Sequence, residues 1–514
     1  MVGLPYLIKS PKKPKQALME ENASYYSGRL NKTLHSKSPF IGPRPRFGFI
    51  AKAFTKNTRK RDPTDRLIYL SKKDPIFLKR TKPVLQIAGP MALANLSVPM
   101  LGLVDTAILG HLENASILAA AALGAHIITL VFWSFGFLRM STTGLTGRLY
   151  GAEKYSELKT ALVRALLIAV LLASFILLIG QLGLSWLAHL LGGGSGVAEL
   201  SSTYMQIRVW SAPATLATYC FVGCFIGLGK TRHALAVLLV ANITNGLLDY
   251  LLIVKLQMDI RGAAYASLIA EYIGLTTAAL LCVSIFKKDL FAQAKISDTF
   301  NPAKLREILQ AHLDLFLRTI SLLLVFLIVT TAGVRISPEV AAANAILLNL
   351  LSFSAHAIDG FAYAAEALCG RAWGKRDFEE FWLVAKESTL YSLLLGIAFV
   401  LAFLLLQQPI LSLYTNLPEV ILEANKVYLW LALLPMVALW CYQLDGIFIG
   451  IGHTQSMRNS MLFSFLLIFL PLFFFTQDLG NAGVWLALSI FYLARVISLG
   501  VPLVAIYQTQ KKEA

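Results

Sequence analysis

Long apolar stretches follow one another through most of this 514-residue chain, and they limit what it can fold into. A helix that crosses the hydrocarbon core of a bilayer needs about 20 apolar residues. Twelve stretches reach this length, with approximate ends at 84–110, 117–145, 158–180, 198–228, 232–254, 260–285, 304–332, 339–368, 381–406, 420–450, 457–475 and 481–507. Because 56% of the residues are hydrophobic and only 15% are charged, the sequence predicts an all-α integral membrane protein with twelve transmembrane helices.

The basic residues are concentrated at the start of the chain. Residues 1–83 hold 20 Lys and Arg against 5 Asp and Glu, whereas the remaining residues are nearly balanced. The net charge of +17 therefore describes a basic tail and does not indicate a nucleic-acid-binding protein. We expect this tail to be disordered or to lie on an anionic membrane surface. A transit peptide and an over-long start assignment are the alternatives.

The loops between the apolar stretches indicate an orientation. With the N-terminus inside, the inner loops carry most of the Lys and Arg residues, and the outer loops carry only Lys255, Arg261, Arg335 and Lys426. This asymmetry follows the positive-inside rule, and an even number of crossings returns the C-terminus to the same side. We expect a multi-pass protein of the cell (inner) membrane with both termini in the cytoplasm.

Two short motifs each occur twice with the same offset of 223 residues. Gly147-Arg-Leu-Tyr-Gly151 returns as Gly370-Arg-Ala-Trp-Gly374, and Phe225-Ile-Gly-Leu-Gly-Lys-Thr231 returns as Phe448-Ile-Gly-Ile-Gly-His-Thr454. Because the offset covers six predicted spans, both halves have the same orientation in the membrane. The repeat therefore predicts two six-helix lobes related by a pseudo-two-fold axis along the membrane normal.

The predicted lobes cover residues 84–290 and 291–514, an arrangement typical of an alternating-access transporter and not of a channel or a membrane enzyme. The sequence contains no P-loop, no HExxH and no GxSxG motif, so we expect neither ATP hydrolysis nor another catalytic activity. Transport would then be driven by an ion gradient, without a cofactor.

Ionisable side chains inside a membrane span are costly, so each is a candidate functional residue. Asp105 in span 1, Asn245 and Asp249 in span 5, and Ser267 in span 6 lie at similar depth in the outer half of the first lobe. Two close carboxylates in a low dielectric cannot both stay charged, which suits a proton carrier. The oxygens of Asp105, Asn245 and Asp249 would also suit Na⁺, a hard cation. A buried network that only packs the helices is the structural alternative.

The second lobe places its charges differently. Asp314 and Arg318 are four residues apart near the start of span 7, and this spacing predicts a structural ion pair. Asp359 in span 8 and Asp445 in span 10 are candidates for contacting a cationic substrate. In span 1, Pro90 removes a backbone hydrogen bond and favours a kink, so this helix could bend when its carboxylate is protonated.

Seven segments together resemble the MATE (multidrug and toxic compound extrusion) family, specifically its DinF branch. They are Val104-Asp-Thr-Ala-Ile-Leu-Gly110, Thr143-Gly-Leu-Thr146, Asn245-Gly-Leu-Leu-Asp-Tyr250, Leu317-Arg-Thr319, Ala343-Asn-Ala-Ile-Leu-Leu-Asn349, Asp359-Gly-Phe-Ala-Tyr-Ala-Ala-Glu-Ala367 and Asp445-Gly-Ile-Phe-Ile-Gly450. In similar proteins the first-lobe acidic site uses an Asp, an Asn, a second Asp and a Thr. These carry over to Asp105, Asn245, Asp249 and, with Ser in place of Thr, Ser267. The bending first helix of the family matches Pro90.

The resemblance implies a two-lobe antiporter that exports lipophilic, often cationic, compounds in exchange for H⁺ or Na⁺, and the DinF-like Asp on span 8 matches Asp359. We expect a monomeric multidrug efflux antiporter in the lipid bilayer, with H⁺ favoured as the coupling ion. A lipid-linked saccharide flippase of the same superfamily is one alternative, and it should place Lys or Arg in its cavity. The others are a non-transporting membrane scaffold whose basic tail recruits anionic partners, and an organellar metabolite exporter.

Overall fold

The structure is a computed structural model that describes residues 83–97, 115–191, 195–286 and 299–513, and the regular structure in these ranges is helical. Eleven helical segments in them are long and apolar enough to cross a membrane. These segments coincide with the second to twelfth predicted spans, which confirms the prediction of an all-helical membrane protein.

Three predictions fall wholly or partly outside the described residues. The first span is described over residues 83–97 only, so Asp105 lies outside. Nearly all of the predicted basic tail and the predicted lobe boundary near residue 290 also lie outside. The contacts divide the chain into two units, residues 1–73 and 74–514, and all described helices belong to the second unit.

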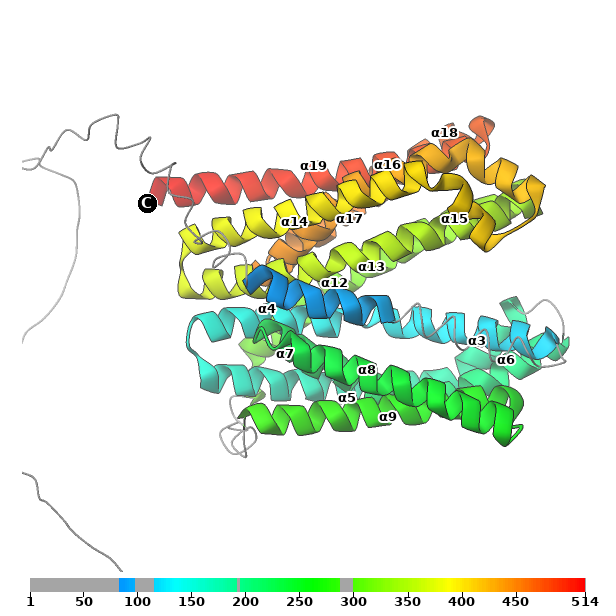
Figure 1. The fold of residues 1–514 in the computed structure, drawn as a ribbon. Helices are drawn as coiled ribbons and strands as arrows, with labels where there is room; N and C mark the ends of the chain where they lie inside the picture. Colours follow the sequence, from blue (N-terminus) through cyan, green and yellow to red (C-terminus); the bar gives the residue numbers. More distant parts are fainter. Residues whose placement is uncertain (1–82, 98–114, 192–194, 287–298, 514) are drawn as a thin grey trace, which may run out of the picture. The chain divides into compact units, whose positions relative to one another are not determined.

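The first half of the described chain contains seven α-helices after residues 83–97, and they make five spans (Figure 1). They are α3 (Ala115–Ser134), α4 (Phe137–Gly151), α5 (Tyr155–Leu191), α6 (Ser195–Arg208), α7 (Ala212–Gly227), α8 (Thr231–Asp249), and α9 (Asp259–Phe286), of which α3 with α4 and α6 with α7 each make one span. A short 3₁₀ turn, Val209–Ser211, joins α6 to α7, and a π-helical turn, Tyr250–Lys255, follows α8 directly.

The second half repeats this pattern. Its helices are α12 (Pro302–Ile336), α13 (Pro338–Lys375), α14 (Phe378–Leu405), α15 (Gln407–Tyr414), α16 (Pro418–Ile451), α17 (Thr454–Leu462), α18 (Leu470–Phe475) and α19 (Asn481–Glu513). A π-helical turn, Phe463–Phe469, lies between α17 and α18, and a 3₁₀ turn, Gln477–Leu479, precedes α19.

Helix starts in this half carry the sequence signals that stop and start a helix. Pro302, Pro338 and Pro418 occupy the first turn, where a missing backbone N–H costs nothing. The side chain of Asn301 accepts hydrogen bonds from the backbone N–H groups of Ala303 and Lys304, which caps α12. These signals break the long apolar sequence into separate spans.

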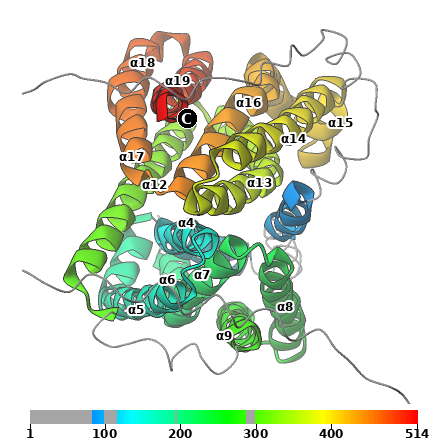
Figure 2. The same ribbon diagram turned by 90° about the vertical axis from the view of Figure 1, so that its left-hand side faces the viewer.

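The internal repeat is visible in the helix boundaries. In the first half α5 begins at Tyr155 and α8 at Thr231, and in the second half α14 begins at Phe378 and α17 at Thr454, in both cases 223 residues later. Figure 2 shows the two groups end-on, with α4–α9 on one side, α13–α19 on the other, and the helix of residues 83–97 at their boundary.

Where the helices cross, glycine allows backbones to touch. A Cβ atom on Gly446 in α16 would overlap the carbonyl oxygen of Ala362 in α13. We therefore expect Gly446→Ala to lower the thermal unfolding midpoint of the purified protein, because overpacking a tight contact costs about 1–3 kcal/mol.

Gly500 in α19 is the matched control for this substitution, since a Cβ there would meet nothing within 4 Å. Gly500→Ala should keep or slightly raise the midpoint, because alanine is the better helix former. Equal melting of the two variants would contradict the close crossing of α13 and α16.

Candidate functional site

Three of the predicted coupling residues form one buried chain in the first lobe. On α8, the side-chain amide of Asn245 donates to Oδ2 of Asp249 one turn later, at 2.5 Å. On α9, the hydroxyl of Ser267 donates to the amide oxygen of Asn245 at 3.3 Å. Asn245, Asp249 and Ser267 are 5%, 1% and 8% exposed. The structure thus brings together every predicted member of this site that it describes.

The backbone next to this chain is irregular. The π-helical turn Tyr250–Lys255 begins directly after Asp249. Such turns interrupt the regular hydrogen bonding of a helix and occur often at functional sites. Asp249 therefore lies where the winding of the helix changes.

The helix of residues 83–97 contacts both lobes. Towards the first lobe, the side chain of Asn242 on α8 donates to the hydroxyl of Ser97 at 2.8 Å, one turn before Asn245. Towards the second lobe, the side chain of Asn95 donates to the carbonyl oxygen of His356 on α13 at 3.2 Å. Pro90 is half-buried within this helix. A movement of this one helix would therefore alter its contacts with both lobes.

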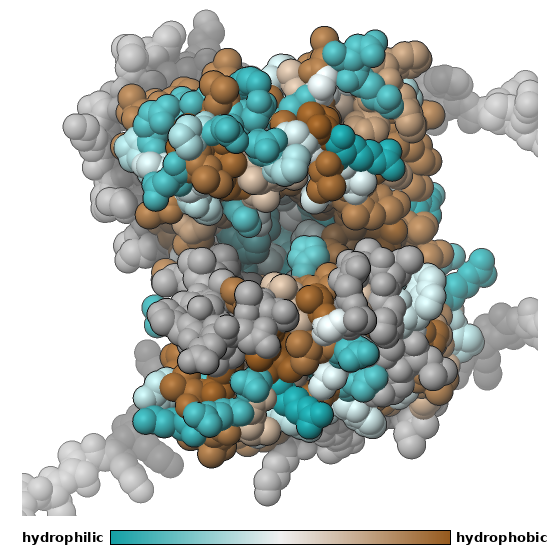
Figure 3. Space-filling view, turned by 90° about the vertical axis from the view of Figure 1, so that its right-hand side faces the viewer, coloured by the Kyte–Doolittle hydropathy of each residue, from teal (hydrophilic) through white to brown (hydrophobic). Residues whose placement is uncertain are grey.

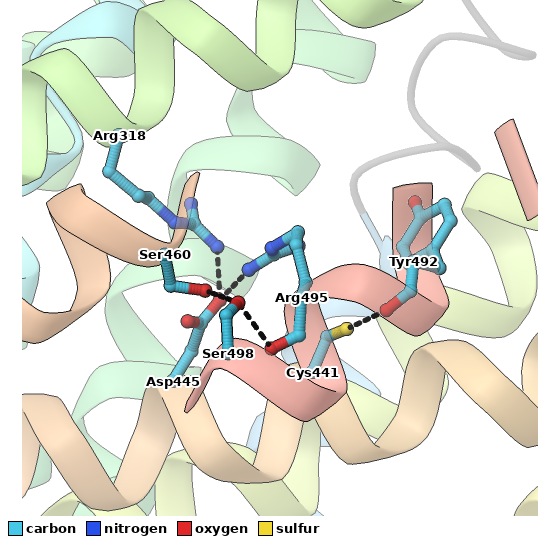
Figure 4. A network of polar contacts seen from close by, with 7 residues as sticks. All are labelled: Arg318, Cys441, Asp445, Ser460, Tyr492, Arg495 and Ser498. Carbon is cyan, nitrogen blue, oxygen red and sulfur yellow. Dashed lines mark hydrogen bonds and ion pairs between the residues drawn. The ribbon is translucent and has the colours of Figure 1, made fainter. Parts of the chain in front are cut away.

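The second lobe contains a buried charge cluster (Figure 4). Arg318 on α12 and Arg495 on α19 both donate to Oδ2 of Asp445 on α16. The bond from Arg495 is 2.7 Å long. All three residues are at most 8% exposed. Several polar atoms of this cluster have no hydrogen-bond partner among the described residues: Nε of Arg318, Oδ1 of Asp445, and Nε and Nη1 of Arg495.

A second charged group crosses between the lobes. Nη1 of Arg139 on α4 lies 3.3 Å from Oε2 of Glu366 on α13, and its guanidinium lies 4.3 Å from the centre of the Tyr363 ring. Asp359 lies about one turn before Tyr363 on the same helix, and its electrostatic neighbours are His356 first, then Arg139, Arg318 and the acidic Asp445. Asp359 is half-buried and makes no hydrogen bond or ion pair that the described residues supply.

The predicted pair of Asp314 with Arg318 is wrong. Asp314 instead accepts hydrogen bonds from Arg458 at 2.6 Å and from the hydroxyl of Thr454 at 2.9 Å, both on α17. Arg318 turns to Asp445. Spacing along one helix only makes a pair possible, and here neighbouring helices supply stronger partners to each residue.

These contacts also change the meaning of the charges between the lobes. Asp359 and Asp445 were predicted to contact a cationic substrate, but Arg139, Arg318 and Arg495 lie close to the three acids Asp359, Glu366 and Asp445, so the charges within this group balance. Glu366 and the two arginines 139 and 495 had no predicted role in binding. The sequence held one signal for these three residues: each is a single charged residue in an apolar run. An unpaired charge inside a membrane is costly, so each of them is expected to have a partner of opposite charge.

One end of the two lobes is hollowed. Figure 3 views the end away from the C-terminus and shows a depression between the two groups of helices, with hydrophilic side chains inside it. At the opposite end α4 and α13 meet closely, as the contacts of their glycines show. A space that reaches one end of two lobes and is closed at the other is what a transporter needs in one of its two states.

Comparisons with known proteins agree with this architecture. The sequence profile of the family named MatE matches residues 90–251 and 315–475, one match in each half. The DNA damage-inducible protein F of Escherichia coli (strain K12) is 37% identical over 423 residues, which cover 81% of this chain and 91% of that protein. Multidrug and toxin extrusion protein 1 of Homo sapiens is 26% identical over 80% of this chain and 72% of that protein.

Among solved structures, an outward-facing multidrug resistance MATE family transporter matches with a TM-score of 0.75 over 84% of this chain and 97% of that chain. At 18% identity this match supports the fold alone. The family profile covers more than half of the chain, and the Escherichia coli relative aligns over nearly its whole length. The chain therefore belongs to the MatE family of multi-pass membrane transporters, whose DinF branch its motifs resemble.

Proposed function

We propose that this protein is a cation-coupled efflux antiporter of lipophilic, often cationic, compounds, with H⁺ as the coupling ion. It works by alternating access in the cell membrane, as a monomer with both termini in the cytoplasm. The observation that carries this proposal is the helix of residues 83–97, which hydrogen-bonds to α8 beside the first-lobe carboxylate and to α13 beside Asp359.

The first lobe supplies the coupling site. Asp105 and Asp249 carry the exchanged cation, and Asn245 and Ser267 orient the Asp249 carboxylate. The amide of Asn245 turns its nitrogen towards Asp249, and its oxygen is engaged by Ser267. A Na⁺ ion would require oxygen ligands there, so this arrangement supports a proton in preference to Na⁺.

The second lobe supplies the substrate contact. Asp359 lies on α13 next to the first span, because a Cβ on the adjacent Gly360 would lie 2.8 Å from the carbonyl oxygen of Ala88. Asp445 is already neutralised by two arginines, so its role is to hold Arg318 and Arg495 in place. Protonation of the first-lobe site then bends the first span at Pro90 and alters the surroundings of Asp359.

The flippase alternative receives less support from these contacts. A lipid pyrophosphate requires cationic side chains that are free to bind it. Arg139 is paired with Glu366, and Arg318 and Arg495 share Asp445. These three arginines are therefore engaged by protein acids.

The test is efflux of a cationic fluorescent dye from proteoliposomes under an imposed pH gradient or an imposed Na⁺ gradient. We expect the pH gradient alone to drive dye movement, and a protonophore to abolish it. Protein-free vesicles are the control for passive leak. Movement driven only by Na⁺ would make the first-lobe oxygens a metal site. If neither gradient moves the dye, the substrate class is wrong, and labelled lipid becomes the next probe.

A further inference from the structure

The repeated Gly-Arg-x-aromatic-Gly motif is not used by the coupling site or the substrate contact, yet both of its copies lie where α4 and α13 end. We propose that Arg148 and Arg371 of these two copies form a reciprocal gate that holds this end of the lobes closed and must open during each transport cycle. This inference rests on the alternating-access part of the proposed function.

The glycines of the motif let the two helices touch backbone to backbone. A Cβ atom on Gly151 would overlap the carbonyl oxygen of Arg371, and a Cβ atom on Gly374 would overlap the carbonyl oxygen of Arg148. The two contacts exchange the roles of the lobes. Such reciprocity is the property of a two-fold interface, in which residue i contacts j and j contacts i.

Arg148 crosses from the first lobe to the end of α16 in the second. Its Nη1 donates to the carbonyl oxygens of Ile449 and Gly450, at 3.3 and 3.0 Å. The last carbonyls of a helix lack partners within the helix and carry partial negative charge, so a guanidinium is a favourable cap for them. Arg148 therefore holds the last turn of a helix in the opposite lobe.

Gly452 is required at this contact for two reasons. Its φ of +80° is a left-handed conformation that ends α16, and a Cβ there would lie 2.5 Å from Nη1 of Arg148. The guanidinium thus lies directly on a residue that has no side chain. The second repeated motif, which contains Gly452, therefore forms the surface that the arginine of the first motif binds.

Arg371 makes the corresponding contact in the opposite direction. Its Nη2 lies 2.9 Å from where a Cβ of Gly229 would be, and Gly229 follows α7 with a φ of +68°. Its guanidinium also covers the ring of Tyr150 at 4.6 Å, a cation–π contact with the first lobe. Arg371 and Gly229 are the counterparts of Arg148 and Gly452, each displaced by 223 residues.

The form of these contacts suits a gate better than a permanent interface. Hydrogen bonds from one guanidinium to carbonyls at the end of a helix break without leaving an empty cavity, and glycine backbones separate without unpacking large side chains. Both halves lie at the same end and are related by the same two-fold repeat, so one rocking movement of the lobes breaks them together. The hollow in Figure 3 lies at the other end, where no such pair is found among the described residues.

Spin-label distances across the closed end test the gate without substrate or gradient, so the result does not depend on the coupling ion or the transported compound. The labels are placed on Lys154→Cys and Arg376→Cys, two exposed positions in loops of opposite lobes, while the five native cysteines are buried. We expect Arg148→Ala to add a longer distance and to change the ratio of the two populations by about tenfold or more, the effect of losing hydrogen bonds made by a charged group. Arg371→Ala should add the same longer distance with a smaller change in the ratio, because it loses a cation–π contact.

Arg232→Ala is the matched control, because Arg232 is an exposed arginine in the first turn of α8 at the same end, and it should leave the distances unchanged. Should an alanine variant fail to fold, Arg148→Lys and Arg371→Lys keep the charge, lose the planar fork and should show the same shift, smaller in size. Folded variants with the parental distance distribution would overturn the gate. Dye efflux that fails while the distances shift as expected would instead overturn the proposed substrate or ion.

Discussion

An Asp249→Asn variant in proteoliposomes is expected to show no ion-driven dye efflux above that of protein-free vesicles. The substitution keeps the size of the side chain and its place beside Asn245 at the end of α8. It removes the ability to carry a charge or a proton, which is the one property that coupling requires of this buried group. Efflux rates under a fixed pH gradient measure the loss, and Asp105→Asn is expected to behave in the same way.

Asp259→Asn is the matched control, because Asp259 begins α9 as an exposed carboxylate. This control should transport at the parental rate. Dye binding to detergent-purified protein separates the two possible causes of failure: the Asp249 variant should still bind dye, whereas a substitution at Asp359 should weaken binding. Parental efflux by folded Asp249→Asn would show that this carboxylate only packs the helices.

The helices of this protein were predictable because the bilayer imposes a simple requirement on each span. Apolar length alone located the segments, and the described helix at 338–375 differs from the predicted 339–368 mainly by continuing past the apolar region. That extension carries Arg371 and its flanking glycines to the other lobe. Hydropathy does not register it, because the contact is made by backbone atoms and one charged side chain.

The candidate site was predictable only where one helix fixes the geometry. Asn245 and Asp249 are four residues apart on α8, and the helical repeat brings them into contact. The same rule misled for Asp314 and Arg318, because partners on α16 and α17 were closer. Which of several possible partners a buried charge takes depends on how helices from distant parts of the sequence pack, and spacing carries no information about this.

The repeated motifs indicate internal symmetry, but the contacts that they make are not apparent from the sequence. Two glycines four residues apart on a helix are a signal for the close approach of a second helix. An arginine between these glycines is then near enough to contact the neighbouring helix. The signal was present at Gly147, Gly151, Gly370 and Gly374. What the sequence could not supply was the partner, because the ends of α7 and α16 approach the arginines only when both lobes are folded together.

An Asp445→Asn variant is expected to show a large loss of stability, greater than that of Gly446→Ala. Asp445 is the carboxylate to which both Arg318 and Arg495 donate within the described part of the chain. Removing its charge leaves two buried guanidinium groups without this partner, and breaking a buried ion pair from one side costs about 3–5 kcal/mol. Thermal unfolding of the detergent-purified protein measures the loss as a lower midpoint.

Asp478→Asn is the control for this change, because Asp478 is exposed in the short turn before α19 and should melt like the parent. The stronger test is the combination of Asp445→Asn with Arg495→Met. It removes one of the stranded charges and leaves Arg318 near Asp359, so the double variant should be more stable than Asp445→Asn alone. A parental midpoint for Asp445→Asn, accompanied by weaker dye binding, would reverse this assignment, because Asp445 would then contact the substrate and Arg318 and Arg495 would need another partner.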